Sequence, residues 1–180
     1  MNDFFQIIKA RHSYRGAFLN TPVTRAQIET ILDAGRAAPS ACFKQSPRFI
    51  VIDAPAVMDS VKDLPAFVNS PVIQTAQAFI LIVFDPTPQH GVNSYGAEDC
   101  GAAATNMLNA VTALGLASVW VDGELRGGTG KSLDRILNVP APFSSRILLP
   151  LGVPEKPGGQ PARKPAAERV GWNTFTPAMR

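Results

Sequence analysis

Two stretches of this sequence carry residues suited to binding an anionic group. Near the N-terminus, the stretch RHSYR places Arg11, Ser13 and Arg15 at alternate positions, so an extended backbone points the three side chains the same way. Guanidinium groups are planar, permanently charged donors that match phosphate oxygens, and the hydroxyl adds a further donor. A second basic pair, Arg163 and Lys164, lies near the C-terminus. From the residues alone, RHSYR is also consistent with two solvated arginines after an amphipathic helix.

A third stretch, GGTGKS at residues 127–132, looks at first like the loop that holds the phosphates of ATP or GTP. That loop needs a glycine five positions before the glycine of Gly-Lys-Ser, and this position holds Leu125. We therefore interpret the glycines as a flexible loop, with Thr129 or Ser132 as the cap of the helix that follows.

Size and composition restrict the class of protein. The 180 residues are enough for one domain with a hydrophobic core, and we expect a single domain over residues 1–180. Charged residues make up 17% and the net charge of +3 is scattered, which argues against a nucleic-acid-binding surface. The longest apolar run, Ala78 to Phe84, is too short to cross a membrane. Two cysteines without metal-site spacing, and no secretion signal, predict a cytoplasmic protein.

The hydrophobic pattern predicts helices and short strands in irregular alternation. We expect helices over residues 3–11, 24–38, 97–116 and 131–137 and after Pro55, and strands over residues 48–53, 76–85, 117–122 and 145–152. Thr24 is the expected N-cap of the second helix, and Pro39 ends it. The longest helix contains Gly101 and three alanines, which allow a close approach of another backbone. Together, these predicted helices and strands indicate an α+β domain with a central sheet between helices.

Four stretches, in order along the whole chain, resemble motifs of the FMN-dependent nitroreductase family. They are RHSYR, AAPSACFKQSPRFIVI, DCGAAATNMLNAVTALGLASVWVDG and LPLGVPEKP with ARKPAAERVGW. The resemblance implies a nitroreductase-like fold with a central, mixed, mostly antiparallel sheet. It also implies a homodimer with FMN at the subunit interface, the long central helix in that interface, and an extended C-terminal tail (about residues 153–180) packed on the partner subunit.

The resemblance also implies a set of cofactor-binding residues. Arg11 would hold the FMN phosphate, Ser13 the phosphate or ribityl hydroxyls, and Arg15 the ribityl and pyrimidine end, where a cation stabilises the charge that builds on reduction. The turn Trp120, Val121, Asp122 and Gly123 would present a backbone N–H to flavin N5. The remaining implied contacts are His12, Pro39 and Ser40 (from the partner chain), Gln45, Asn69, Arg163 and Lys164. No catalytic side chain and no metal are required, because flavin N5 carries the chemistry.

The sequence departs from the family's pattern in two places. The family's usual Asn, Pro and Trp positions hold Phe43, Ser46 and Pro47, which changes the contacts that this loop can offer to the cofactor. The segment between Phe84 and Tyr95, where the family often inserts lid helices, is short, and this predicts a more open pocket.

The function that the resemblance implies is an FMN-dependent NAD(P)H oxidoreductase of ping-pong type. NAD(P)H would pass a hydride to flavin N5, and an electron-poor acceptor such as a nitroaromatic, a quinone or an activated alkene would then take it from the same pocket. Two alternatives stay open at this point. One is a non-catalytic flavin-binding or redox-sensing dimer, and the other is a different flavin chemistry on the same fold, such as reductive dehalogenation.

Overall fold

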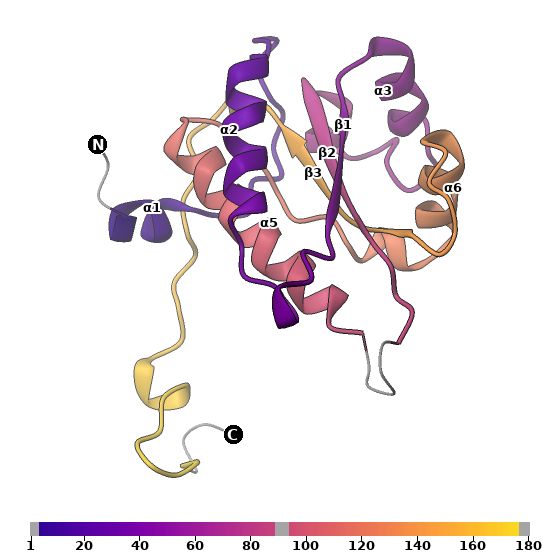
Figure 1. The fold of residues 1–180 in the computed structure, drawn as a ribbon. Helices are drawn as coiled ribbons and strands as arrows, with labels where there is room; N and C mark the ends of the chain where they lie inside the picture. The colour runs from indigo at the N-terminus through magenta and orange to yellow at the C-terminus, as the bar shows by residue number, and fades with distance from the viewer. Residues whose placement is uncertain (1–3, 89–93, 177–180) are drawn as a thin grey trace.

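The centre of the molecule is a sheet of three strands, which Figure 1 shows between two groups of helices. The computed structural model describes residues 4–88 and 94–176. Strand β2 (Ala78–Phe84) lies between β1 (Arg48–Ile52) and β3 (Ser144–Leu151) and is antiparallel to both. The register pairs Ile50 with Leu81 across β1 and β2, and Leu81 with Leu148 across β2 and β3.

Six helices and three short turns of 3-10 helix are found in the described residues. The helices are α1 (Phe4–Ala10), α2 (Arg25–Arg36), α3 (Pro55–Lys62), α4 (Pro71–Gln74), α5 (Gly96–Ala113) and α6 (Gly128–Ile136), and the 3-10 turns are η1 (Ala41–Phe43), η2 (Glu124–Arg126) and η3 (Ala166–Glu168).

Strand β2 is apolar throughout because both of its faces are buried. Phe79, Leu81 and Val83 belong to the core on the side of α3, α4 and α6. The residues between them, Ile80 and Ile82, belong to the core formed with α2 and α5. Alternate side chains of β2 therefore pack into two hydrophobic layers, one on each face of the sheet. The prediction of an α+β domain with a sheet between helices is confirmed.

Helices α2 and α5 form one wall of the domain. Thr24 caps α2 as predicted, since its hydroxyl accepts from Gln27 N while the Gln27 side chain accepts from Thr24 N. A Cβ added at Gly35 would collide with the Met107 side chain, so glycine at this position lets α2 pack closely on α5. The predicted long helix is confirmed as α5.

Two predictions about secondary structure are wrong. Residues 117–122 do not form a strand; they make only isolated bridges, from Ala117 to Gly152 and from Val121 to Leu148. The register of these two bridges places Val119 opposite Pro150, and proline has no N–H to donate, so the ladder is interrupted between the bridges.

The second wrong prediction concerns the glycine-rich stretch. Helix α6 begins at Gly128 rather than at Lys131, and its N-cap is Gly127 without a side-chain hydrogen bond. Neither Thr129 nor Ser132 is therefore the cap. Gly130 has a packing role, since a Cβ there would collide with the carbonyl oxygen of Leu125.

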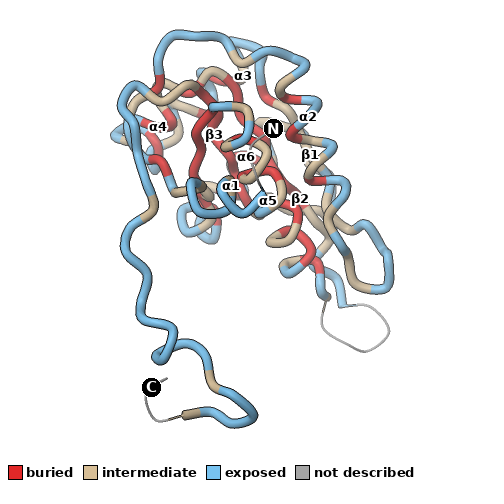
Figure 2. The backbone as a smooth tube through the Cα atoms, turned by 90° about the vertical axis from the view of Figure 1, so that its left-hand side faces the viewer, coloured by how far each residue is buried: buried red, intermediate tan, exposed pale blue. Residues whose placement is uncertain are grey.

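The C-terminal part of the chain leaves the body of the domain. Figure 2 shows that the tail beyond β3 is exposed for most of its length, in contrast to the buried strands. Trp172 and Phe175 are 85% and 68% exposed there, and on α1 the rings of Phe4 and Phe5 are 61% and 66% exposed. Within the described ranges, no helix combines the length and the apolar character needed to cross a bilayer.

Candidate functional site

The RHSYR stretch follows α1 and is held from its buried side. Arg11 N donates to Ile7 O at the end of the helix, and Tyr14 N donates to Ser118 O. Tyr14 is 7% exposed and its hydroxyl donates to Ala17 O at 2.5 Å, whereas its neighbours Ser13 and Arg15 are exposed. The alternation of side chains expected for this stretch is thus present.

The side chains of Arg11, Ser13 and Arg15 are available for a ligand. In the described parts of the chain, none of them makes a hydrogen bond or an ion pair. His12 differs, because its Nδ1 lies 3.0 Å from Ala10 O while its Nε2 is buried without a hydrogen-bond partner among the described residues. Two guanidinium groups without a carboxylate partner among residues 4–88 and 94–176, next to a hydroxyl, form a donor set that suits a phosphate.

The C-terminal tail returns to this stretch. Leu19 N donates to Val153 O at 2.9 Å, and Glu155 N donates to Ala17 O at 3.1 Å and to the Tyr14 hydroxyl at 3.1 Å. Figure 1 shows the tail passing α1 before it leaves the domain.

Gln160 makes the last link between the tail and RHSYR. Its Nε2 donates to Arg11 O at 2.7 Å, and its Oε1 accepts from Arg163 Nε at 3.2 Å. Basic residues from the two ends of the sequence therefore come to one region. Lys164 instead lies 3.8 Å from Glu168 in an exposed pair.

The turn Trp120 to Gly123 lies against the edge of β3. Val121 and Leu148 exchange both backbone hydrogen bonds, at 3.1 and 2.9 Å. Trp120 is half-buried, and its ring lies 3.4 Å from where a Cβ on Gly101 would sit. Ser118, two residues before Trp120, accepts a hydrogen bond from Tyr14 N of RHSYR. The turn and RHSYR are therefore neighbours.

The carboxylate of Asp122 is engaged by two arginines. Arg126 Nε lies 3.0 Å from Oδ1 and Arg146 Nη1 lies 3.2 Å from Oδ2. The hydrogen bond from Arg126 is the main cause that lowers the pKa of Asp122 below its ordinary value, with a smaller contribution from the charge of Arg146. Asp122 is therefore an ionised anchor for the turn and is a poor proton acceptor at neutral pH.

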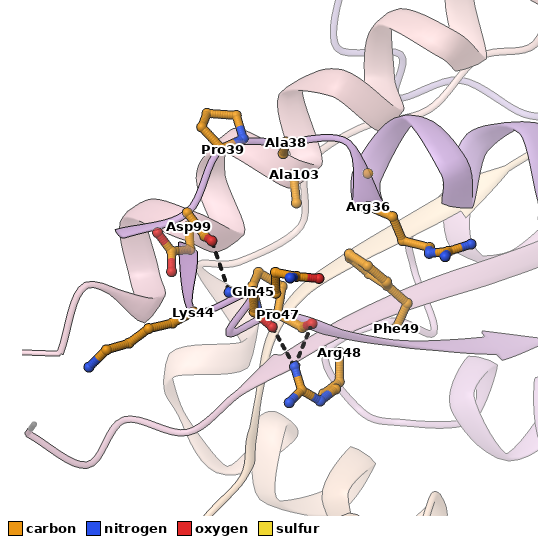
Figure 3. A pocket seen from close by; sticks show the side chains of 12 residues that line it. Arg36, Ala38, Pro39, Lys44, Gln45, Pro47, Arg48, Phe49, Asp99 and Ala103 are labelled. Carbon is orange, nitrogen blue, oxygen red and sulfur yellow. Dashed lines mark hydrogen bonds between the residues drawn. The ribbon is translucent and has the colours of Figure 1, made fainter. Parts of the chain in front are cut away.

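A cavity of about 500 Å³ lies between the end of α2, the turn that follows and the first half of α5. Its wall includes Pro39, Ser40 and Gln45, which the resemblance had assigned to the cofactor, together with Asp99 and Phe49. Figure 3 shows Pro39, Gln45, Asp99 and Phe49 around this cavity, with Arg48 turned toward the backbone of the turn. Arg48 Nη1 donates to the carbonyls of residues 45–47.

Asp99 fixes the turn that borders this cavity. It is 6% exposed, and its carboxylate accepts from Ala41 N at 2.9 Å and from the Ser46 hydroxyl. The turn needs this support, because Cys42, Phe43 and Gln45 have φ angles of 52°, 55° and 49°, which cost free energy for residues other than glycine.

The structure does not bring all the expected residues together in one chain. RHSYR, the turn at residues 120–123 and Arg163 form one group, and Pro39, Ser40 and Gln45 form another; within the described ranges no hydrogen bond joins the two groups. Asn69 is exposed in the turn before α4, with no hydrogen bond to either group in the described chain.

Three polar residues with supporting roles were missed by sequence reasoning: Asp99, Arg146 and Gln160. Asp99 carried a weak signal as an acidic residue in the first turn of a long helix. Arg146 and Gln160 carried none, since their partners lie far away in the sequence.

Comparison with known proteins gives a consistent result. The chain matches the Nitroreductase family over residues 8–153. It is 29% identical over 155 residues, 86% of this chain and 87% of the relative, to an Archaeoglobus fulgidus protein assigned as an NADH dehydrogenase/NAD(P)H nitroreductase. It is 29% identical over 189 residues, covering 97% of this chain and 75% of the relative, to the NADPH-flavin oxidoreductase of Vibrio harveyi.

Solved structures share the fold. A Desulfovibrio desulfuricans protein assigned as a nitroreductase, in complex with FMN, superposes with a TM-score of 0.80 at 28% identity, covering 98% of this chain and 99% of that one. Nitroreductase A of Vibrio parahaemolyticus gives 0.81 at 25% identity, covering 98% and 78%. The family match spans most of the sequence and the fold agrees over nearly all of it, so this chain belongs to the nitroreductase family.

Proposed function

We propose that this protein is an FMN-dependent NAD(P)H oxidoreductase that transfers hydride in a ping-pong cycle to an electron-poor acceptor. The general activity, flavin-dependent oxidation of NAD(P)H, follows from the family and from relatives named as NAD(P)H nitroreductase and NADPH-flavin oxidoreductase. The structural observation that carries the assignment is the donor set of RHSYR next to Arg163, whose members Arg11, Ser13 and Arg15 have no side-chain partner in the part of the chain that the structure describes.

The residues present fit FMN. A phosphate needs fixed cationic donors that are not neutralised internally, and Arg11, Ser13 and Arg15 meet this condition in the described chain. Bound FMN would supply two-electron chemistry at its N5 position, which exchanges hydride with nicotinamide and acceptor. The FMN-bound relative from Desulfovibrio desulfuricans supports this choice of cofactor.

The chain's own residues would bind and orient. Arg11 and Arg163 would hold the phosphate with Lys164 nearby, and Ser13 would bind the phosphate or ribityl chain. Arg15 would place a positive charge where negative charge develops on reduction. Since Asp122 is ionised and paired with two arginines, its contribution would come from the backbone of the Trp120–Gly123 turn and not from proton transfer.

We further propose a homodimer in which each cofactor site uses both chains. In one chain, the loop with Pro39, Ser40 and Gln45 is separate from RHSYR, as a site completed by a second copy would require. The exposed aromatic rings of α1 and of the tail are apolar surface that a partner subunit would cover.

Asn69, near the pyrimidine edge in this proposal, is the least anchored contact. The unpaired state of Cys42 and Cys100 agrees with a cytoplasmic location.

The purified protein tests the proposal directly. We expect a yellow protein with flavin absorbance that bleaches anaerobically on addition of NADH or NADPH and regains colour when a nitroaromatic or a quinone is added. A yellow protein that neither nucleotide bleaches would favour a flavin-binding module without this activity. A colourless protein that does not take up added FMN would refute the proposal.

A further inference from the structure

Gln160 uses its whole amide group to join the two ends of the chain. Its Nε2 donates to two carbonyls at the end of α1, Ile8 O at 3.0 Å and Arg11 O at 2.7 Å. Its Oε1 accepts from Arg163 Nε at 3.2 Å. Both donors and the acceptor of one side chain are thus satisfied, and all three partners flank the proposed phosphate donors.

The backbone next to Gln160 is shaped for this contact. A Cβ added at Gly158 would collide with His12 Nε2, so only a glycine lets the tail lie flat on this ring. The ring has little freedom to withdraw, because Nδ1 lies 3.0 Å from Ala10 O and the ring makes an edge contact with Tyr14 at 6.4 Å between centroids. The tail is therefore seated on RHSYR at two successive points.

We propose that Gln160 is a positioning residue that holds Arg163 beside Arg11 so that the two guanidinium groups form one phosphate-binding site. The inference rests on the proposed function. Without Gln160, Arg163 belongs to an exposed tail and must be ordered at the moment of binding, which weakens the phosphate contact. Binding and tail docking are then coupled, so a phosphate-bearing ligand stabilises the docked tail by the same factor by which docking strengthens the ligand.

The coupling predicts a difference between two flavins. FMN and riboflavin share the ring and the ribityl chain, but only FMN has the phosphate. Gln160→Met keeps the length of the side chain and removes its hydrogen bonds, so FMN affinity should fall by about tenfold while riboflavin affinity stays unchanged. Gly158→Ala should act in the same direction by lifting the tail from His12. Gln6→Met, on the exposed surface of α1, is the matched control and should change neither affinity.

Two measurements on the full-length protein test the inference: fluorescence titration with each flavin, and trypsin cleavage of the tail after Arg163 or Arg169. In the wild type, FMN should protect the tail more than riboflavin does, and Gln160→Met should abolish this difference. An unchanged ratio of FMN to riboflavin affinity in both variants, or an equal loss of both affinities, would overturn the inference and leave the proposed function intact. A wild-type protein that binds neither flavin would overturn both.

Discussion

Replacing Asp99 with alanine removes the carboxylate that ties the turn after α2 to the central helix. Two hydrogen bonds are lost, from Ala41 N and from the Ser46 hydroxyl, and bonds to a charged acceptor contribute about 1.5–3 kcal/mol each. Ala41 and Ser46 are only half-buried, so water can satisfy the released groups. The freed turn can also relax its positive φ angles, each of which costs about 1 kcal/mol or more. Two such bonds contribute about 3–6 kcal/mol and relaxation of the three angles offsets about 3 kcal/mol, so we expect a net loss of up to about 3 kcal/mol in the free energy of unfolding.

A matched control exists in the same chain. Asp134 also accepts from one backbone N–H and one serine hydroxyl, Ser145 N at 2.9 Å and Ser145 Oγ at 2.6 Å, but it supports β3 and not the turn at the cavity. Urea denaturation should give Asp134→Ala a larger loss, about 3–6 kcal/mol, because two bonds of the same kind are lost without relaxation of the turn at residues 42–45. Amide hydrogen exchange separates the two variants, because only Asp99→Ala should speed exchange across residues 40–47.

The result that would refute this reasoning is specific. If Asp99→Ala changes the free energy of unfolding by less than about 0.5 kcal/mol and leaves exchange at residues 40–47 unaltered, the carboxylate does not hold the turn. If Asp134→Ala speeds exchange at residues 40–47 as much as Asp99→Ala does, the effect is global and the local role assigned to Asp99 is wrong.

Three further changes give measurable outcomes. Arg11→Ala should weaken FMN binding by about 1.5–3 kcal/mol in a fluorescence titration, and an unchanged affinity would remove Arg11 from the site. Gly130→Ala should lower the free energy of unfolding by about 1–3 kcal/mol because its Cβ meets the Leu125 carbonyl, whereas Gly128→Ala, which faces open space, should be near neutral. Asp122 has a lowered pKa in the folded state, so its stabilising contribution is present above the ordinary aspartate pKa of 3.8 and is lost as pH falls through the folded value. Between about pH 2 and pH 5, Asp122→Asn should flatten the dependence of unfolding free energy on pH, and an unchanged slope would contradict the assignment.

The parts of the fold that could be predicted depend on local signals. The capping box at Thr24, the apolar periodicity of α5 and the unbroken apolar run of β2 are each complete within one element. The sheet between helices was predicted from these elements, whereas the order of its three strands was not predicted.

Of the two failed predictions, one depended on a contact between distant parts of the sequence and the other on a local contact. Residues 117–122 have the composition of a strand, but their register with β3 places Val119 opposite Pro150, a residue of another element that has no N–H to donate. The start of α6 was misplaced because all the glycines of this stretch were interpreted as a flexible loop. Gly130 instead lies inside α6, where it allows a close approach to the carbonyl of Leu125. Pro150 lies outside a local window around residues 117–122, whereas Leu125 lies only five positions before Gly130.

The same distinction applies to the candidate site. Arg11 and Arg163 were expected to meet because of the family resemblance, whereas the residue that joins them, Gln160, has its partner Arg11 149 positions away. Asp99 and Ala41 are 58 positions apart. Sequence reasoning found side chains whose chemistry suits a phosphate, and it missed the neutral or structural residues that place them, since an amide or a buried carboxylate has no fixed relation to the motif that it supports.

Because distant residues hold the phosphate donors of RHSYR, the anion site forms differently from a glycine-rich phosphate loop. A glycine-rich phosphate loop is built by one continuous segment, whose own backbone N–H groups surround the ligand. RHSYR has no such local scaffold: its backbone is held by Ser118 from the segment after α5 and by Gln160 from beyond the last strand. The donors can converge only after β3 has paired with β2 and the tail has folded back on α1. A phosphate contact at RHSYR is therefore a property of the folded chain as a whole, and flavin binding should be lost together with global unfolding and not retained by an N-terminal fragment.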